Sequence, residues 1–249
     1  MAMTRRSVLL SAGTAVPGLA LGAVGGVPAP ASRKIKVMVC GGHPGDPEYG
    51  CGGTVARLTA MGHEVVLMYL NDGGWPPTPS IVRIAEATKA CGILKARPAY
   101  AGQENGHSIV DNAHYDEYEK LIAAENPDAV ITQWPIDNHP DHRAITMLTY
   151  NAWQKLNKKF ALYYYEVSDG EDTLQFSPNR YVDIAQVEVQ KKASCYAHAS
   201  QTPDRYYELQ DTVARFRGLE SGYERAEGFL WQLQSPFDIF PLLENYAIK

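Results

Sequence analysis

Short apolar runs alternate with helical stretches along most of this chain, and that alternation limits its fold more than any other feature. Strands and helices joined by short links are typical of a mostly parallel sheet with helices on both faces, so the sequence predicts an α/β protein. The predicted strands cover residues 35–40, 63–70, 128–133, 160–167 and 181–184, and the predicted helices cover 54–61, 80–91, 114–126, 140–156 and 187–200.

The first 31 residues carry the features of a signal peptide. Arg5 and Arg6 precede an uncharged run, residues 8–27, which ends near an A-x-A site at Ala31. An uncharged run of about 20 residues is also long enough for a membrane anchor, but its glycines and prolines favour a cleavable leader. The paired arginines predict export by the twin-arginine route to the periplasm or the cell exterior, with no stable membrane anchor. Residues 32–249 are then predicted to form a single domain.

Composition excludes several classes of protein. The formal net charge is −5, which argues against a nucleic-acid partner bound through a basic surface. The four cysteines are too few for a disulfide scaffold, and their spacing shows no paired pattern. The sequence carries no signal for a particular oligomeric state.

Glycines after the first strand raise the question of a dinucleotide site. The segment from Gly50 to Val55 lacks the third glycine of G-x-G-x-x-G, because Val55 stands in its place. We therefore expect these glycines to allow a sharp loop or a close approach to a ligand or a helix.

Metal-ligand residue types follow two of the predicted strands. His43 and Asp46 come after the first strand, and His139, Asp141 and His142 come after the strand at 128–133. Carboxyl ends of parallel strands meet at one edge of the sheet, so these side chains should converge. Two imidazoles and a carboxylate with an open fourth position suit catalytic Zn²⁺, while Fe²⁺ and Mn²⁺ also accept such ligands.

The second of these segments also predicts how its helix begins. Pro140 suits the first helical position, which makes His139 the N-cap and His142 the third helical residue. Both imidazoles then lie at the mouth of the helix, where one can bind metal and the other can act on the substrate. Asp141 can hydrogen-bond one of the rings and fix its tautomer.

The chain resembles the LmbE/PIG-L zinc deacetylases. The resemblance rests on the motif from His43 to Thr54 and on His139 to Arg143, and it covers most of residues 35–230. Weaker matches are Gly62 to Val65, Asn71 to Gly74, Arg83 with Glu86 and Ala87, Tyr164 to Glu166, Lys191 to Ala193 and His198 to Gln201. The resemblance implies a Rossmann-like fold and removal, through zinc-bound water, of acetyl groups from N-acetylated amino sugars or glycoconjugates.

The resemblance also implies roles for individual residues. His43, Asp46 and His142 match the metal ligands, and His139 matches the residue that stabilises the tetrahedral intermediate, oriented by Asp141. Arg83 matches a residue near the substrate, although a surface ion pair with Glu86 explains it equally well. Asn105 falls where the family often has a sugar-contacting aspartate, and an Asn-Gly turn is the simpler alternative.

One position departs from the family pattern. The resemblance places the general base at position 45, which is glycine in this chain. Glu48, Asp137 or Asp141 could replace the base, or the metal alone could generate enough hydroxide. The remaining alternative is a catalytically weakened, metal-dependent carbohydrate-binding protein of the same fold. Two further expectations are that His198 is structural or supports another residue, and that residues 75–77 form a rim or lid.

Overall fold

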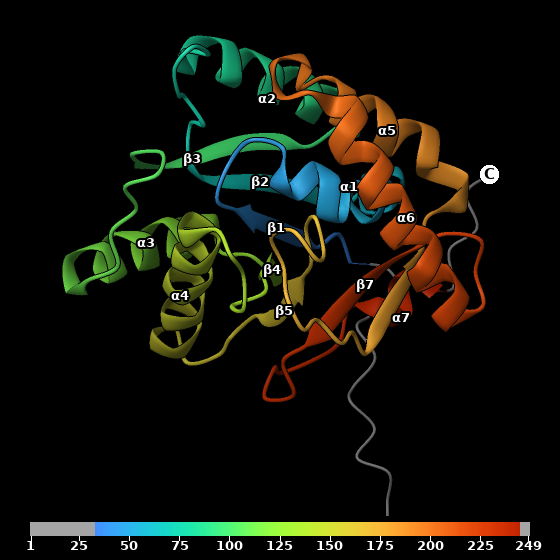
Figure 1. Ribbon diagram of the computed structural model, residues 1–249. Coiled ribbons are helices and arrows are strands. Elements are labelled where there is room, and N and C mark those ends of the chain that lie inside the picture. The colour runs from blue at the N-terminus through green and yellow to red at the C-terminus, as the bar shows by residue number, and fades with distance from the viewer. Residues whose placement is uncertain (1–32, 245–249) are drawn as a thin grey trace, which may run out of the picture.

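A computed structural model describes residues 33–244, which contain one seven-stranded sheet with helices on both faces (Figure 1). The predicted signal peptide lies outside these residues. The strands are β1 (Lys36–Gly41), β2 (Glu64–Asn71), β3 (Arg97–Gln103), β4 (Ala129–Gln133), β5 (Ala161–Tyr165), β6 (Arg180–Asp183) and β7 (Ala226–Trp231). The α-helices are α1 (Asp46–Ala60), α2 (Ser80–Leu94), α3 (Asn112–Glu125), α4 (Pro140–Lys155), α5 (Glu188–Tyr196), α6 (Pro203–Ser221) and α7 (Phe240–Glu244). Two 3-10 turns, η1 (Ala185–Val187) and η2 (Ala199–Gln201), flank α5.

The strand order is β3-β2-β1-β4-β5-β7-β6. The first five strands in this order are parallel, whereas β7 pairs antiparallel with both β5 and β6. After β1 the chain continues to β2, toward the β3 edge of the sheet, whereas after β4 it continues to β5, toward the β6 edge. The carboxyl ends of β1 and β4 therefore form the switch point at which open α/β sheets bind ligands. The predicted α/β class with a mostly parallel sheet is confirmed.

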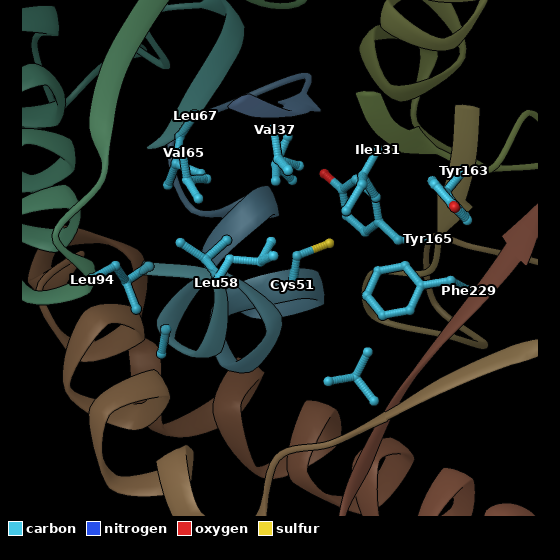
Figure 2. Packing of buried hydrophobic residues seen from close by; sticks show 14 of the residues in the cluster. Val37, Cys51, Leu58, Val65, Leu67, Leu94, Ile131, Tyr163, Tyr165 and Phe229 are labelled. Atoms are coloured by element: carbon cyan, nitrogen blue, oxygen red, sulfur yellow. The ribbon is translucent and has the colours of Figure 1, made fainter. Parts of the chain in front are cut away.

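Two apolar cores lie on opposite faces of the sheet. On one face, α1 packs on the central strands through Cys51 and Leu58, beside Val37, Ile131 and Tyr165 (Figure 2). The opposite core includes Tyr118 and Ile122 of α3 and Ile145, Leu148 and Trp153 of α4. Burial on both faces explains why β1, β2, β4 and β5 read as continuous apolar runs rather than as alternating patterns.

Helix α1 begins at Asp46, eight residues before the predicted start. Gly50, Gly52 and Gly53 therefore lie within a helix rather than in a loop, despite the low helix propensity of glycine. Close packing overrides propensity here, because a Cβ added at Gly50 would lie 2.3 Å from Cδ2 of Tyr165. The expected close approach to a helix is found at Gly52, where an added Cβ would lie 3.1 Å from Cγ of Lys191 in α5, and the expected loop is wrong.

Other differences from the predicted elements have similar causes. Helix α2 continues through Gly92 and ends at Leu94, where Lys95 takes the left-handed conformation. The predicted elements lack β3, an edge strand that contains Pro98, a residue tolerated at sheet edges. They also lack β7.

The four cysteines, Cys40, Cys51, Cys91 and Cys195, are buried and unpaired. Within residues 33–244, no helix is both long enough and apolar enough to cross a membrane.

Candidate active site

The segments that follow β1 and β4 bring the predicted ligand residues together. Oδ2 of Asp46 lies 3.3 Å from Nδ1 of His43 and 3.2 Å from Nε2 of His142. Ligands bound tetrahedrally at about 2.0–2.1 Å lie about 3.3 Å apart, so these separations match those of a zinc site. His139 is also close, since His43, His139 and His142 each offer a ring nitrogen within 4.8 Å of the others.

The far side of each ligand ring is held by a carboxylate. Nε2 of His43 donates to Asp141 (3.0 Å), and Nδ1 of His142 donates to Asp137 (3.1 Å). Protein metal sites commonly hold their histidines in this way, because the hydrogen bond fixes the ring and its tautomer. The free nitrogen of each ring then faces Asp46. These residues fit a divalent metal.

The local backbone also holds Asp46 in place. Asp46 is the first residue of α1, and its Oδ2 accepts hydrogen bonds from the backbone nitrogen of His43 (2.8 Å) and from Nε2 of Gln133 (3.2 Å). Gly42 is needed beside it, because an added Cβ would lie 3.0 Å from Cδ2 of His142 and 3.3 Å from Oδ2 of Asp46.

In the metal-free site, Asp46 stabilises the charged forms of the His43 and His142 rings, and these rings stabilise the charged form of Asp46. Burial by itself lowers the pKa of His142, but the charge of Asp46 and the hydrogen bond to Asp137 outweigh it and raise that pKa to about 10. Burial by itself also lowers the pKa of His43, but the opposing effects, led by the charge of Asp46, outweigh burial, so that pKa is raised as well. Burial would raise the pKa of Asp46, but the two imidazolium rings hold it well below its usual value.

His139 differs from the two predicted ligand rings because it stays neutral. Burial, reinforced by the positive charges of His43 and His142, lowers its pKa to about 4. As predicted, His139 is the N-cap of α4 and Pro140 the first helical residue. Nδ1 of His139 accepts from the backbone nitrogen of Asp141 (3.2 Å), so the proton of the neutral ring is on Nε2.

Asp141 holds a different ring from the one that the resemblance implied. Its carboxylate accepts from His43, from Nδ2 of Asn71 (3.1 Å) and from the backbone nitrogen of Gly106 (2.8 Å). Within residues 33–244, the ring of His139 is hydrogen-bonded only to the backbone nitrogen of Asp141, and the backbone nitrogen of His139 donates to Oδ1 of Asp137 (2.7 Å). Asp141 thus orients the ring of His43, a predicted ligand, through its side chain and the ring of His139 through its amide.

A cavity of about 590 Å³ opens over this cluster. Arg83 and Asn105 both line it, as does Trp75, whose exposed fraction of 57% places it at the rim. Arg83 donates to Glu86 (3.1 Å) and to the carbonyl oxygen of Pro44 (2.5 Å), so it both forms the expected ion pair and braces the His43 segment. Asn105 donates to the carbonyl oxygen of Gly74 (3.2 Å).

Gly45 adopts a backbone conformation that only glycine takes readily, with φ of +115°. A Cβ placed there would meet the ring of Tyr49 at 3.8 Å and Cδ2 of His198 at 3.9 Å, which is ordinary contact. Space for a small side chain therefore exists at position 45, but an aspartate there would be strained.

Sequence reasoning missed two groups at the site. Gln133 holds Asp46, and a polar residue at the carboxyl end of a buried strand was a signal for it. Asp172 lines the cavity from the loop between β5 and β6, and no motif marks it in the sequence.

Comparisons with known proteins agree with this geometry. Residues 38–153 match the family model of PIG-L, the GlcNAc-PI de-N-acetylase family. The chain is 28% identical over 217 residues to diacetylchitobiose deacetylase of Thermococcus kodakarensis, covering 78% of this chain and 81% of that protein. A conserved protein of Thermus thermophilus superposes with a TM-score of 0.72 and 25% identity, over 83% of this chain and 98% of the other. N,N'-diacetylchitobiose deacetylase of Pyrococcus horikoshii shares the fold, with a TM-score of 0.68, 24% identity and coverage of 79% and 83%. The motifs, the sheet order and the histidine cluster lead to one conclusion: this chain belongs to the PIG-L/LmbE family of de-N-acetylases.

Proposed function

We propose that this protein hydrolyses the acetamido group of an N-acetylated amino sugar or glycoconjugate. Water adds to the amide carbonyl carbon, the C–N bond breaks, and acetate and a free amine are released. The observation that carries the proposal is the convergence of Asp46 on His43 and His142, each held from behind by a carboxylate. The similarity to a diacetylchitobiose deacetylase supports the substrate class.

His43, Asp46 and His142 would hold the metal, with Zn²⁺ preferred and Fe²⁺ or Mn²⁺ as alternatives. Such an ion supplies Lewis acidity, which lowers the pKa of water and polarises a carbonyl group. Because His142 carries a proton in the metal-free site at neutral pH, this ring must lose that proton before its Nε2 can act as a ligand.

His139 is placed to stabilise the charge that develops on the amide oxygen. Its ring is neutral, its proton is on Nε2, and it lines the cavity beside the ligand rings. A fixed donor of this kind acts on the transition state more than on the substrate. Arg83 and Asn105, in the cavity wall, are the proposed contacts to the sugar.

The alternative of a weakened enzyme that binds carbohydrate is favoured by one observation, the glycine at position 45. Comparing Gly45→Asp with Gly45→Ala separates the carboxylate from the backbone strain that both substitutions introduce. A binding protein that lacks only its base should gain deacetylase activity from Gly45→Asp and none from Gly45→Ala. An enzyme with a base elsewhere should lose stability in both variants without gaining rate.

The function is tested by metal analysis of the purified protein together with an acetate-release screen of N-acetylated mono- and disaccharides. Stoichiometric metal and acetate release, both lost on treatment with a chelator and restored by Zn²⁺, are the expected results. Absence of acetate release alongside tight sugar binding would instead support the binding protein.

We also propose that the protein is exported by the twin-arginine route. Replacing Arg5 and Arg6 with lysine should leave the protein in the cytoplasm with its leader uncleaved. Cell fractionation reports the location, and the size of the chain reports the cleavage. Unchanged export of the double variant would contradict this proposal.

A further inference from the structure

The carboxylates near the cavity differ in whether their oxygens already have partners. Glu48 is fully buried and accepts from the backbone nitrogen of Gly45 (3.1 Å), the hydroxyl of Tyr69 (2.7 Å) and Nε2 of His198 (3.0 Å). Its oxygens are occupied by structural hydrogen bonds. Glu48 is therefore poorly placed to accept a proton from water.

The two carboxylates behind the ligand rings are buried and hold those rings. Asp137 accepts from His142 through Oδ1 and from the hydroxyl of Thr173 (3.1 Å) through Oδ2. Asp141 accepts hydrogen bonds from His43 and two further donors, all through Oδ2, and its Oδ1 is buried without a partner among the described residues. Neither Asp137 nor Asp141 lines the cavity. Drawing either carboxylate into proton transfer would release a ligand ring.

Asp172 is different, because it lines the cavity and its carboxylate has no partner among the described residues. It lines the cavity together with Gly45, Asp46 and His142. Among residues 33–244, none forms a hydrogen bond or an ion pair with its side chain. Burial raises the pKa of Asp172 against the opposing effect of the His142 charge, and the nearby Asp46 and Asp137 add to the rise. A carboxylate of this kind is a stronger proton acceptor than an exposed aspartate.

The loop that carries Asp172 is tied to the structure behind the metal ligands. The backbone nitrogen of Asn138 donates to the carbonyl oxygen of Asp172 (2.8 Å). The backbone nitrogen of Asp172 donates to the carbonyl oxygen of Ser168 (2.9 Å). Thr173 forms a β-bridge with Asp137 and also donates to its carboxylate. Since Asp137 holds His142, the position of Asp172 is fixed relative to the ligand rings.

We propose that Asp172 is the proton-transfer group that replaces the base missing at position 45. Its carboxylate accepts a proton from the attacking water as the new C–O bond forms. It then gives that proton to the amide nitrogen as the C–N bond breaks, so the neutral amine leaves together with acetic acid, which retains the second proton of the water and loses it to solvent as acetate. This inference rests on the proposed deacetylase function.

Kinetics of substituted proteins test the assignment. Asp172→Ala should lower kcat by about 10²–10⁴-fold, the usual contribution of a general base, with little change in KM or metal content. Formate should restore part of the rate in Asp172→Ala, where the removed carboxylate leaves space, and not in the isosteric Asp172→Asn. Glu171→Gln is the matched control, because the neighbouring Glu171 is exposed and paired with Arg205, and its kcat should be unchanged.

A second measurement does not depend on activity. Metal-free protein is treated at mildly acidic pH with a water-soluble carbodiimide and glycine amide, and the modified residues are mapped by mass spectrometry. Asp172 should be labelled, whereas Glu48, Asp137 and Asp141 should be protected because their side chains are fully buried. Asp172→Asn should lose that label and keep the thermal stability of the natural protein.

The outcomes separate this inference from the function on which it rests. If the natural protein releases no acetate from any substrate, the proposed function fails. If it is active and Asp172→Ala keeps its kcat, or shows only a raised KM, the assignment of Asp172 is wrong while the function stands. Labelling of Asp137 or Asp141 in place of Asp172 would also overturn the assignment.

Discussion

The two sides of the cavity are built in different ways. On the side formed by the segments after β1 and β4, nearly every polar group has a partner: Asp46 bridges two rings, and Asp137 and Asp141 hold them from behind. On the side formed by the loop between β5 and β6, the carboxylate of Asp172 has no hydrogen bond within residues 33–244. A saturated network is suited to holding an ion in one geometry, whereas a free carboxylate is suited to exchanging protons. The two proposals therefore assign metal binding and proton transfer to different segments of the cavity wall.

The sharpest test of the saturated side removes a ligand. His142→Ala should abolish stoichiometric metal binding and, with it, deacetylation, because two donors cannot replace a three-ligand site. Metal content measured by atomic spectroscopy and acetate release report the two effects. Asn151→Ala, a change on a more distant turn of the same helix, serves as the control and should keep its metal. Retained metal in His142→Ala would mean that His139 is a ligand instead.

His139 tests whether a group on this side acts without binding the ion. His139→Ala should keep its metal and lower kcat by about 10²–10³-fold, the usual cost of losing an oxyanion donor. The loss should be similar across the pH range above 5, because the pKa of His139 is about 4 and the ring is already neutral there. Loss of metal from His139→Ala would instead show that His139 is a metal ligand and does not act on the substrate alone.

Asp137 tests whether the network behind the ligands contributes to metal affinity. Asp137→Asn keeps the size and shape of the side chain but weakens the hydrogen bond that it accepts from Nδ1 of His142. The substitution should lower metal affinity by about 10–100-fold. Competition with a chromogenic chelator measures the change. Glu171→Gln, a substitution in the loop that carries Asp172, should leave the affinity as it is. Equal affinities in all three proteins would show that the hydrogen bond to Asp137 is dispensable.

The smallest expected effect is the release of protons on metal binding. In the metal-free protein the pKa of His142 is raised to about 10, so its proton is present at pH 7 and must leave when the metal binds. At least one proton per metal should be released, and affinity should rise with pH up to about 10. Calorimetry in buffers of different ionisation enthalpy measures the number. By the same linkage, the ion pairs of the metal-free site add stability at neutral pH that is lost as pH rises through about 10.

Much of the ligand side was determined by the sequence, because its information is local. His43 and Asp46 lie three residues apart, and the N-cap at His139 with Pro140 behind it fixes where His142 points. The apolar runs around these residues predicted the strands, and the meeting of strand ends in a parallel sheet brought the two segments together.

The rest was decided by contacts between residues far apart in the chain. Glycines within α1 are explained only by Tyr165, and β7 is a strand only because β5 and β6 offer it partners. Which ring Asp141 holds, and that Glu48 is occupied while Asp172 is free, depends on long-range hydrogen bonds. Residue types and their spacing limit what a side chain can bind, but only the folded backbone determines which partners come within about 3 Å of it.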